Sequence, residues 1–106
     1  MDVQIKRGLL EVCVLAAIKN RESYGYQIVK DISPYTQISE STLYPSLRRL
    51  ESAHMLTVRT AEYNGRLRKY YSITPEGKER LRIFAGEWHE IMRIYKFVVG
   101  EEQTND

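Results

Sequence analysis

The chain has 106 residues, which fits one small domain with a modest hydrophobic core, and its formal net charge of +2 is too small to indicate a nucleic-acid ligand by itself. Its 42% hydrophobic and 28% charged residues are ordinary for a folded globular protein, and no stretch is apolar enough to cross a bilayer. The single Cys13 excludes an intramolecular disulfide and a multi-cysteine zinc site, and we expect a cytoplasmic protein with no membrane contact, metal, cofactor or catalytic residue.

The first third of the chain carries the pattern of two helices. From Gln4 to Lys19 apolar residues recur at helical spacing, which predicts a helix that is buried on most of its circumference. Cys13 lies in this stretch, where a buried core position is a simpler interpretation than a redox-active thiol. Ser23 is a candidate N-cap for a second helix, and Pro34 would end it because proline disfavours helical geometry in the residue before it.

A third helix is expected to begin at a serine cap, either Ser39 or Ser41. Pro45 favours Ser41, because a proline in the first turn costs little, whereas a start at Ser39 would make a kink. Three leucines recur at i, i+4 and i+7 and predict one buried stripe: Leu43, Leu47 and Leu50.

The opposite face of this third helix is polar and is a candidate for contact with DNA. Its outward side chains are Ser41, Tyr44, Pro45, Arg48 and Ser52. Hydroxyl groups and a phenol can reach phosphates or base edges, and Arg48 can bond a guanine or a phosphate. The alternative is a solvated face without a ligand, as most polar helix faces are.

Two short β-like segments follow, Leu56 to Tyr63 and Leu67 to Ile73, and Asn64-Gly65 between them predicts a tight hairpin because both residues tolerate positive φ. The basic residues Arg66, Arg68 and Lys69 near the turn could lie along the DNA backbone or in the minor groove. Lys6, near the start of the first helix, is a further candidate phosphate contact. An ordinary solubilising turn is the alternative.

Thr74-Pro75-Glu76 predicts the start of a last helix, with a threonine cap, a proline at the first position and an acid at the positive dipole end. Apolar residues then alternate spacings of three and four, a heptad seam that predicts a dimer interface. The seam consists of Leu81, Phe84, Trp88, Ile91, Tyr95 and Val98. Trp88 could be a plain interface anchor, or with Met92 could bind a small aromatic effector.

The element order predicts a mainly α fold with a small β-hairpin. We expect a winged helix-turn-helix that binds DNA over residues 1–74, a C-terminal dimerisation helix over 75–99 and a disordered acidic tail over 100–106.

Several motifs, in this order, resemble the PadR family of bacterial transcriptional regulators. They are Tyr24-Gly25-Tyr26-Gln27-Ile28, Ser41-Thr42-Leu43-Tyr44-Pro45 with its continuation to Glu51, and Gly65-Arg66 with Arg68-Lys69-Tyr70-Tyr71 and its continuation to Gly77. The resemblance spans roughly Ile5 to Tyr95, and the short terminal helix is similar to that of the small PadR subfamily.

This resemblance implies a homodimeric repressor that binds an inverted repeat in double-stranded DNA. By position, Ser41, Thr42, Tyr44 and Arg48 would match the recognition helix, and Arg66 with Lys69 the wing. Trp88 falls where a multidrug-sensing branch of the family carries a tryptophan that stacks planar aromatic ligands. The alternatives are a winged helix used for protein–protein contact and a small-molecule sensor with secondary DNA affinity.

Overall fold

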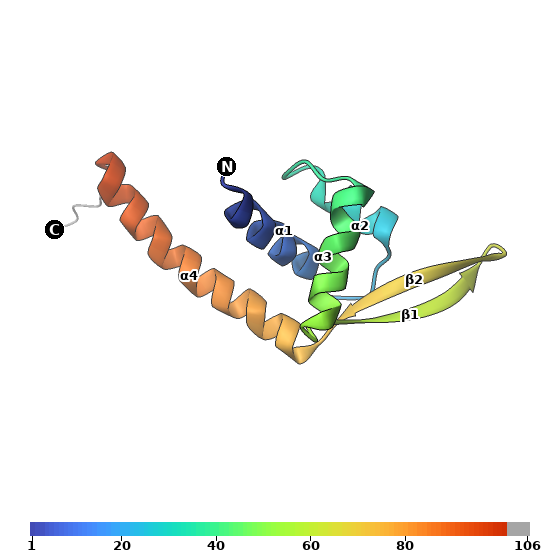
Figure 1. Ribbon diagram of the computed structural model, residues 1–106. Coiled ribbons are helices and arrows are strands. Elements are labelled where there is room, and N and C mark those ends of the chain that lie inside the picture. Colours follow the sequence, from blue (N-terminus) through green and yellow to red (C-terminus); the bar gives the residue numbers. More distant parts are fainter. Residues whose placement is uncertain (102–106) are drawn as a thin grey trace.

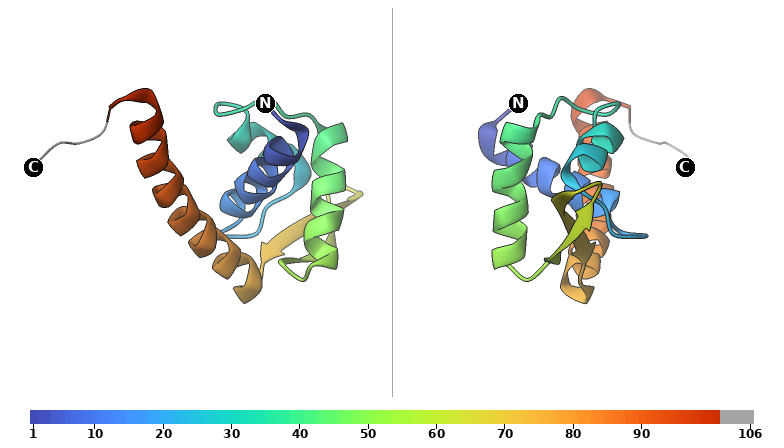
Figure 2. Two further views of the ribbon diagram at one scale, coloured as in Figure 1. Left: turned by 60° about the vertical axis from the view of Figure 1, so that its left-hand side comes forward. Right: turned by 90° about the vertical axis from the view of Figure 1, so that its right-hand side faces the viewer.

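The computed structural model describes residues 1–101, and it consists of a three-helix core, a projecting hairpin and a long terminal helix (Figure 1). The elements are α1 (Val3–Ala17), α2 (Gly25–Ile32), α3 (Glu40–Ser52), β1 (Leu56–Tyr63), β2 (Arg66–Ile73) and α4 (Pro75–Val99). This order confirms the predicted fold class, mainly α with a small β-hairpin. The molecule is elongated, with principal extents of 62 × 27 × 22 Å, because the hairpin and α4 both extend from the core (Figures 1 and 2).

The core lies between α1, α2, α3 and the base of the hairpin. Leu43, Leu47 and Leu50 are at most 2% exposed, so the predicted leucine stripe of α3 is confirmed. They pack with buried residues of the other elements: Val14, Leu15, Ile18, Ile28, Ile32, Leu56 and Tyr71. Each fully buried leucine of this kind stabilises the fold by roughly 1.5–3 kcal/mol through area removed from water, so this stripe sets the orientation of α3.

The predicted cap of α2 is wrong. Tyr24, not Ser23, is its N-cap residue. Ser23 is buried and forms an antiparallel bridge with Tyr71 of β2: its N–H donates to the Tyr71 carbonyl at 3.0 Å, and its carbonyl accepts from the Tyr71 N–H at 2.7 Å. A cap pattern is local in sequence, whereas this pairing partner lies far along the chain. Ser23 therefore adds a single antiparallel bridge to β2, next to the two strands of the hairpin.

The preference for Ser41 as the cap of α3 is also wrong, because the helix begins after Ser39. The backbone N–H of Ser39 donates to Thr42 Oγ1 at 3.1 Å, half of a capping box that stabilises the earlier start. The helix continues through Pro45, which lacks the N–H that would bond the carbonyl of Ser41.

The hairpin is confirmed, with a two-residue turn at Asn64 and Gly65, whose φ angles are 51° and 78°. β2 begins at Arg66, one residue earlier than predicted, and Arg66 pairs with Tyr63. Opposite residues of an antiparallel pair share a face. One face therefore carries Leu56, Val58, Tyr71 and Ile73 toward the core, and the other carries Arg59, Tyr63, Arg66, Arg68 and Tyr70.

The predicted start of α4 is confirmed. Thr74 Oγ1 accepts a hydrogen bond from the Gly77 N–H at 3.0 Å and donates one to the His54 carbonyl at 2.7 Å. Gly77 lies so close to the β-hairpin base that a Cβ there would be 2.3 Å from the Met55 carbonyl oxygen. Glycine is therefore required for this helix to leave the hairpin at its observed position.

The far end of α4 stands away from the core and ends at Gly100, whose φ of 81° suits glycine (Figure 2). Among residues 1–101, no helix combines the length and apolar character needed to span a membrane. Gly100 and Glu101 are the only parts of the predicted acidic tail inside the described range, so its disorder stays a prediction.

Candidate nucleic-acid interface

The outward face of α3 presents the residues predicted to contact DNA. Ser41, Thr42, Tyr44 and Arg48 are all exposed on this helix, opposite the buried leucine stripe. Ser41 and Thr42 lie in its first turn, where the Thr42 hydroxyl is used for capping and Ser41 Oγ lies 2.9 Å from Ser39 Oγ. The arginine ion pairs among residues 1–101 involve Arg49, Arg59 and Arg82, which leaves the guanidinium of Arg48 for a ligand.

Tyr44 is held in place by a glycine at the start of α2. A Cβ at Gly25 would lie 2.6 Å from the Tyr44 hydroxyl oxygen, so the phenol occupies space that a side chain at position 25 would need. The Tyr24-Gly25-Tyr26 and Thr42-Leu43-Tyr44-Pro45 motifs therefore touch in space. Sequence reasoning did not single out Gly25 as a site residue, and its place in a motif was the signal that could have found it.

Tyr71 connects this face to the hairpin. It is 5% exposed, and burial raises its pKa, with smaller contributions in the same direction from Tyr44 and Glu51 and an opposing one from Arg48. The Tyr71 ring is thus neutral at physiological pH and lies beneath the α3 surface that carries Tyr44 and Arg48. Tyr71 therefore supports both the outward face of α3, which we call the reading face, and the hairpin to which it belongs.

A hollow of about 370 Å³ lies where α2, α3 and β2 meet. It brings three predicted site residues, Tyr44, Arg68 and Lys69, to one place. Its other lining residues are Tyr24, Gly25, Tyr26, Glu40, Leu67 and Tyr71. Tyr26 is 61% exposed here and was not predicted as a site residue.

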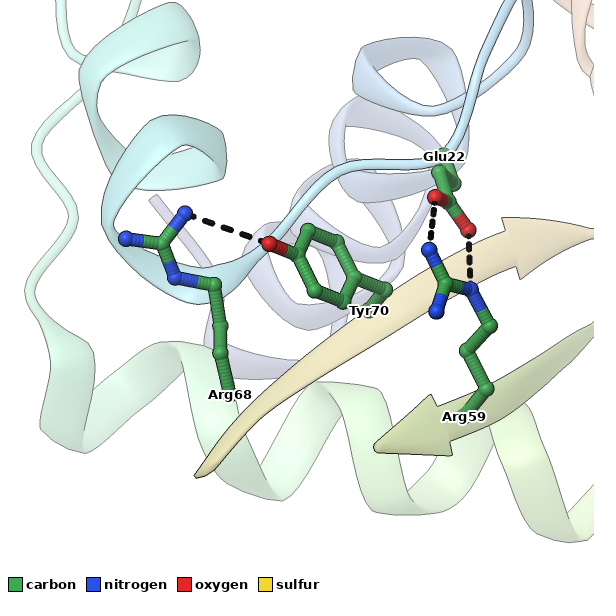
Figure 3. Close-up of polar contacts among 4 residues, drawn as sticks. All are labelled: Glu22, Arg59, Arg68 and Tyr70. Carbon is green, nitrogen blue, oxygen red and sulfur yellow. Dashed lines mark hydrogen bonds and ion pairs between the residues drawn. The ribbon is translucent and has the colours of Figure 1, made fainter. Parts of the chain in front are cut away.

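The basic residues of the hairpin fall into two groups. Arg66 and Lys69 are exposed and take no part in the ion pairs among residues 1–101. Arg59 instead pairs with Glu22 through two hydrogen bonds of 2.9 and 2.5 Å, which hold the pKa of Glu22 below its usual value (Figure 3). Arg68 is half-buried, and its Nη1 donates to the Tyr70 hydroxyl at 3.4 Å (Figure 3). Among residues 1–101, Arg59 is therefore paired with an acid, whereas Arg66, Lys69 and Arg68 keep their charge, and Arg68 differs from the other two by its contacts with tyrosine.

Lys6 of α1 lies near the start of α3. It borders a hollow of about 470 Å³ together with Ser33, Ser39, Thr42 and the segment from Thr36 to Ile38. The N-terminus of a helix carries a partial positive charge, so the lysine and the first turn of α3 favour an anion on the same side.

The heptad seam of α4 starts in the core and then leaves it. Leu81 packs against the core cluster of its own chain. The side chains further along are increasingly exposed, with Trp88 at 41%, Ile91 at 46%, Tyr95 at 49% and Val98 at 71%. The Phe84 and Trp88 rings are stacked, with centroids 5.9 Å apart and planes 19° from parallel. A continuous exposed apolar helix face of this kind marks an interaction surface.

Cys13 is half-buried, and burial raises the pKa of its thiol, which opposes thiolate formation. Residues 1–101 contain no cluster of three His, Cys, Asp or Glu side chains that could hold a metal ion.

Known proteins match this chain over most of its length. The model of the family described as "Transcriptional regulator PadR-like family" matches residues 14–83. The crystal structure of smu.1704 from Streptococcus mutans is 39% identical, with a TM-score of 0.78, and the match covers 93% of this chain and 94% of that one. A PadR family transcriptional regulator from Eggerthella lenta is 33% identical, with a TM-score of 0.81 and coverage of 92% and 87%.

The fold is also similar to that of Bacillus subtilis PadR, whose structure is known in complex with operator DNA. The identity is 24% and the TM-score 0.67, and the match covers 73% of this chain and 46% of that one. At this identity the likeness supports the fold alone.

The contact between Gly25 and Tyr44 predicts a specific coupling. We expect Gly25→Ala to lower the free energy of unfolding by about 1–2 kcal/mol, because its Cβ collides with the tyrosine hydroxyl. In a Tyr44→Ala background the same change should be neutral or stabilising. Thermal or urea unfolding of the single and double variants measures this coupling.

Gly8→Ala is the matched control, since a Cβ there meets nothing within 4 Å and alanine is the better helix former. An equal cost of Gly25→Ala in both backgrounds would show that the two residues are not in contact.

Proposed function

Because the chain belongs to the PadR-like family of transcriptional regulators, which are not enzymes, we propose that it is a homodimeric repressor that binds an inverted-repeat operator in double-stranded DNA. The observation that carries the proposal is the exposed α3 face with Tyr44 and Arg48, where the exposed Lys69 of the hairpin lies at the same hollow as Tyr44. Residues 1–74 would form the DNA-binding unit and residues 75–99 the dimerisation helix, and the protein would act in the cytoplasm.

In this proposal α3 enters the major groove. The guanidinium of Arg48 joins no ion pair within residues 1–101, and it can form two hydrogen bonds to a guanine or bind a phosphate. Tyr44 is 38% exposed, and its hydroxyl lies against Gly25. Ser41 and Thr42 lie in the first turn, where hydroxyls and backbone N–H groups approach phosphates.

The hairpin and α1 would add backbone contacts on either side of the groove. Arg66 lies beside the tip, on the face away from the core, and suits the minor groove, whose negative potential attracts arginine. Lys69 lies on the other face, at the hollow beside Tyr44. Lys6 lies near the opposite end of the reading surface, at the start of α3.

Dimerisation would use the exposed part of α4. Pairing of two such helices around a two-fold axis covers Trp88, Ile91, Tyr95 and Val98, which are otherwise in water. The same axis would relate the two copies of α3, and binding to an inverted repeat requires them on one side of the DNA. The operator half-sites should then lie about 10 base pairs apart, one turn of DNA.

A protein–protein module with an acidic partner is the alternative use of the same basic surface. Salt dependence separates the two, because specific DNA binding releases counterions and weakens steeply as salt rises. Weak DNA binding that ignores sequence under all conditions would favour the protein–protein alternative.

The first prediction from this proposal concerns the reading face. Arg48→Ala should weaken binding to the palindrome upstream of the chain's own gene by about 5- to 150-fold, the range for loss of one bidentate base contact. Tyr44→Ala should also weaken it, with Tyr44→Phe as the control that keeps the ring. Fluorescence anisotropy at fixed salt measures the affinities, and unchanged affinity for both alanine variants would exclude this face.

A second prediction concerns the dimer. Ile91→Asp should give monomers in sedimentation equilibrium, because it places a charge in an apolar interface without a partner. Arg93→Asp introduces the same carboxylate on the polar side of α4, and it should leave the dimer intact. A dimer that persists with Ile91→Asp would place the interface elsewhere.

A small aromatic effector is a further part of the proposal, and the stacked Phe84–Trp88 pair supports it. Phe84 covers one side of the indole, and Met92 follows one turn later, so a planar cation could stack on the remaining side within the dimer.

Trp88 is the only tryptophan of the chain, which makes its fluorescence a clean probe. Titration with a planar aromatic cation should give saturable quenching, corrected for absorption, that is lost in monomeric Ile91→Asp. A flat titration would leave Trp88 as a plain interface anchor.

A further inference from the structure

Arg66 and Arg68 lie on the same face of β2 but in different surroundings. Arg66 is exposed beside the hairpin tip, whereas Arg68 is half-buried between two tyrosine rings. The guanidinium carbon of Arg68 is 3.8 Å from the ring centroid of Tyr24 and 3.9 Å from that of Tyr63. Both distances are well within the range of a cation–π contact, so the cation is flanked by aromatic rings.

The two rings come from separate parts of the fold. Tyr24 is the N-cap residue of α2, and Tyr63 is the last residue of β1, directly before the turn. Arg68 therefore joins the outer half of the hairpin to the helical core. A two-stranded hairpin is marginally stable alone, so such a contact has a large effect on how firmly its outer half is held.

Neighbouring contacts extend this link along the same face. The Tyr24 ring packs edge-on against Tyr70 with centroids 6.0 Å apart, and Tyr70 accepts the hydrogen bond from Arg68 (Figure 3). The guanidinium carbon of Arg59 lies 4.7 Å from the centroid of the Tyr70 ring, and a hydrogen bond to Glu22 holds this arginine in place. The outer face is thus one connected cluster of rings and guanidinium groups.

The cluster also reaches the reading face through one residue. Tyr24 precedes Gly25, and Gly25 is the residue against which the Tyr44 hydroxyl lies. The chain segment that holds Arg68 is therefore the same segment that positions Tyr44 on α3. The positions of the hairpin and of α3 therefore both depend on the segment Tyr24-Gly25.

We propose that Arg68 is a positioning residue that sets the hairpin relative to α3 for DNA binding, and that it does not itself neutralise a phosphate. The inference rests on the proposed DNA-binding function and replaces the sequence-based prediction that Arg68 contacts DNA. Its partners in this role are Tyr24 and Tyr63.

The two roles require different chemistry. A phosphate contact requires positive charge, which lysine also supplies, although only arginine can bind the phosphate through two N–H groups. A cation held between two rings requires the planar guanidinium, which stacks where a hydrated ammonium does not. Replacement by lysine therefore keeps the charge, and hydrogen exchange in the free protein, where no phosphate is bound, separates positioning from a bidentate phosphate contact.

The experiment compares Arg68→Lys with Arg93→Lys, a substitution of the same kind at an exposed arginine on the polar side of α4, away from the proposed DNA-binding surface. Operator affinity should fall about tenfold for Arg68→Lys, the effect of losing two flanking aromatic contacts, and stay within about twofold for Arg93→Lys. Tyr63→Leu should resemble Arg68→Lys, whereas Tyr63→Phe, which keeps the ring, should retain wild-type affinity. The double variant Arg68→Lys/Tyr63→Leu should bind no worse than either single one.

Amide hydrogen exchange of residues 60–70 in the free protein tests the link without DNA. Exchange should rise in Arg68→Lys and Tyr63→Leu and stay at the wild-type rate in Arg66→Lys, with far-UV circular dichroism confirming that every variant is folded. If exchange follows this pattern while the wild type binds no palindrome specifically, the proposed function fails and the contact stands.

Three outcomes would overturn the proposal. Wild-type affinity for Arg68→Lys together with a loss for Arg68→Ala would make Arg68 a phosphate contact. Unchanged exchange in Arg68→Lys would show that the rings do not hold the hairpin. Raised exchange with unchanged operator affinity would show that the contact stiffens the hairpin without serving DNA binding.

Discussion

The pairing of Ser23 with Tyr71 is the constraint on which the rest of the reading surface depends. Two backbone hydrogen bonds of 3.0 and 2.7 Å join the segment before α2 to β2, and they place the Tyr71 ring in the core beneath α3. Successive strand residues point to opposite faces. Once Tyr71 is inside, Tyr70 and Arg68 must lie outside, beside Tyr24. One pairing therefore decides both how the hairpin joins the core and which of its cations meet the aromatic rings.

Glycine at position 25 makes this arrangement compatible with a tyrosine on the reading helix. The hydroxyl of Tyr44 occupies the space that a Cβ at Gly25 would fill, so α2 and α3 approach closely there. The preceding residue, Tyr24, is the one whose ring contacts Arg68. The affinity of such a surface for DNA depends on side chains held before the ligand arrives, because ordering them on binding would cost entropy. Here the core and the aromatic cluster supply that order.

The sequence predicted the elements whose signals are local. The leucines of α3, the Asn64-Gly65 turn and the Thr74-Pro75 start of α4 each depend on residues within a few positions, and the structure confirms all of them. It failed where a distant partner decides the outcome, because Ser23 bonds β2 in place of capping α2. It also gave no sign that the guanidinium of Arg68 lies between two tyrosine rings. Charge alone could not separate Arg68 from Arg66, since only tertiary contacts distinguish them.

The joint between the hairpin and α4 fixes the angle at which α4 leaves the base of the hairpin. Gly77, in the first turn of α4, lies against the Met55 carbonyl and the Ile73 side chain, and a Cβ there would be 2.3 Å from that carbonyl oxygen. Because this contact involves backbone and no flexible side chain at Gly77, it has little capacity to absorb a change of angle. In a dimer paired through α4, a change in the angle between the two α4 helices would therefore move the base of each hairpin. Through the Arg68 contact, this movement would then reach α2 and the position of Tyr44.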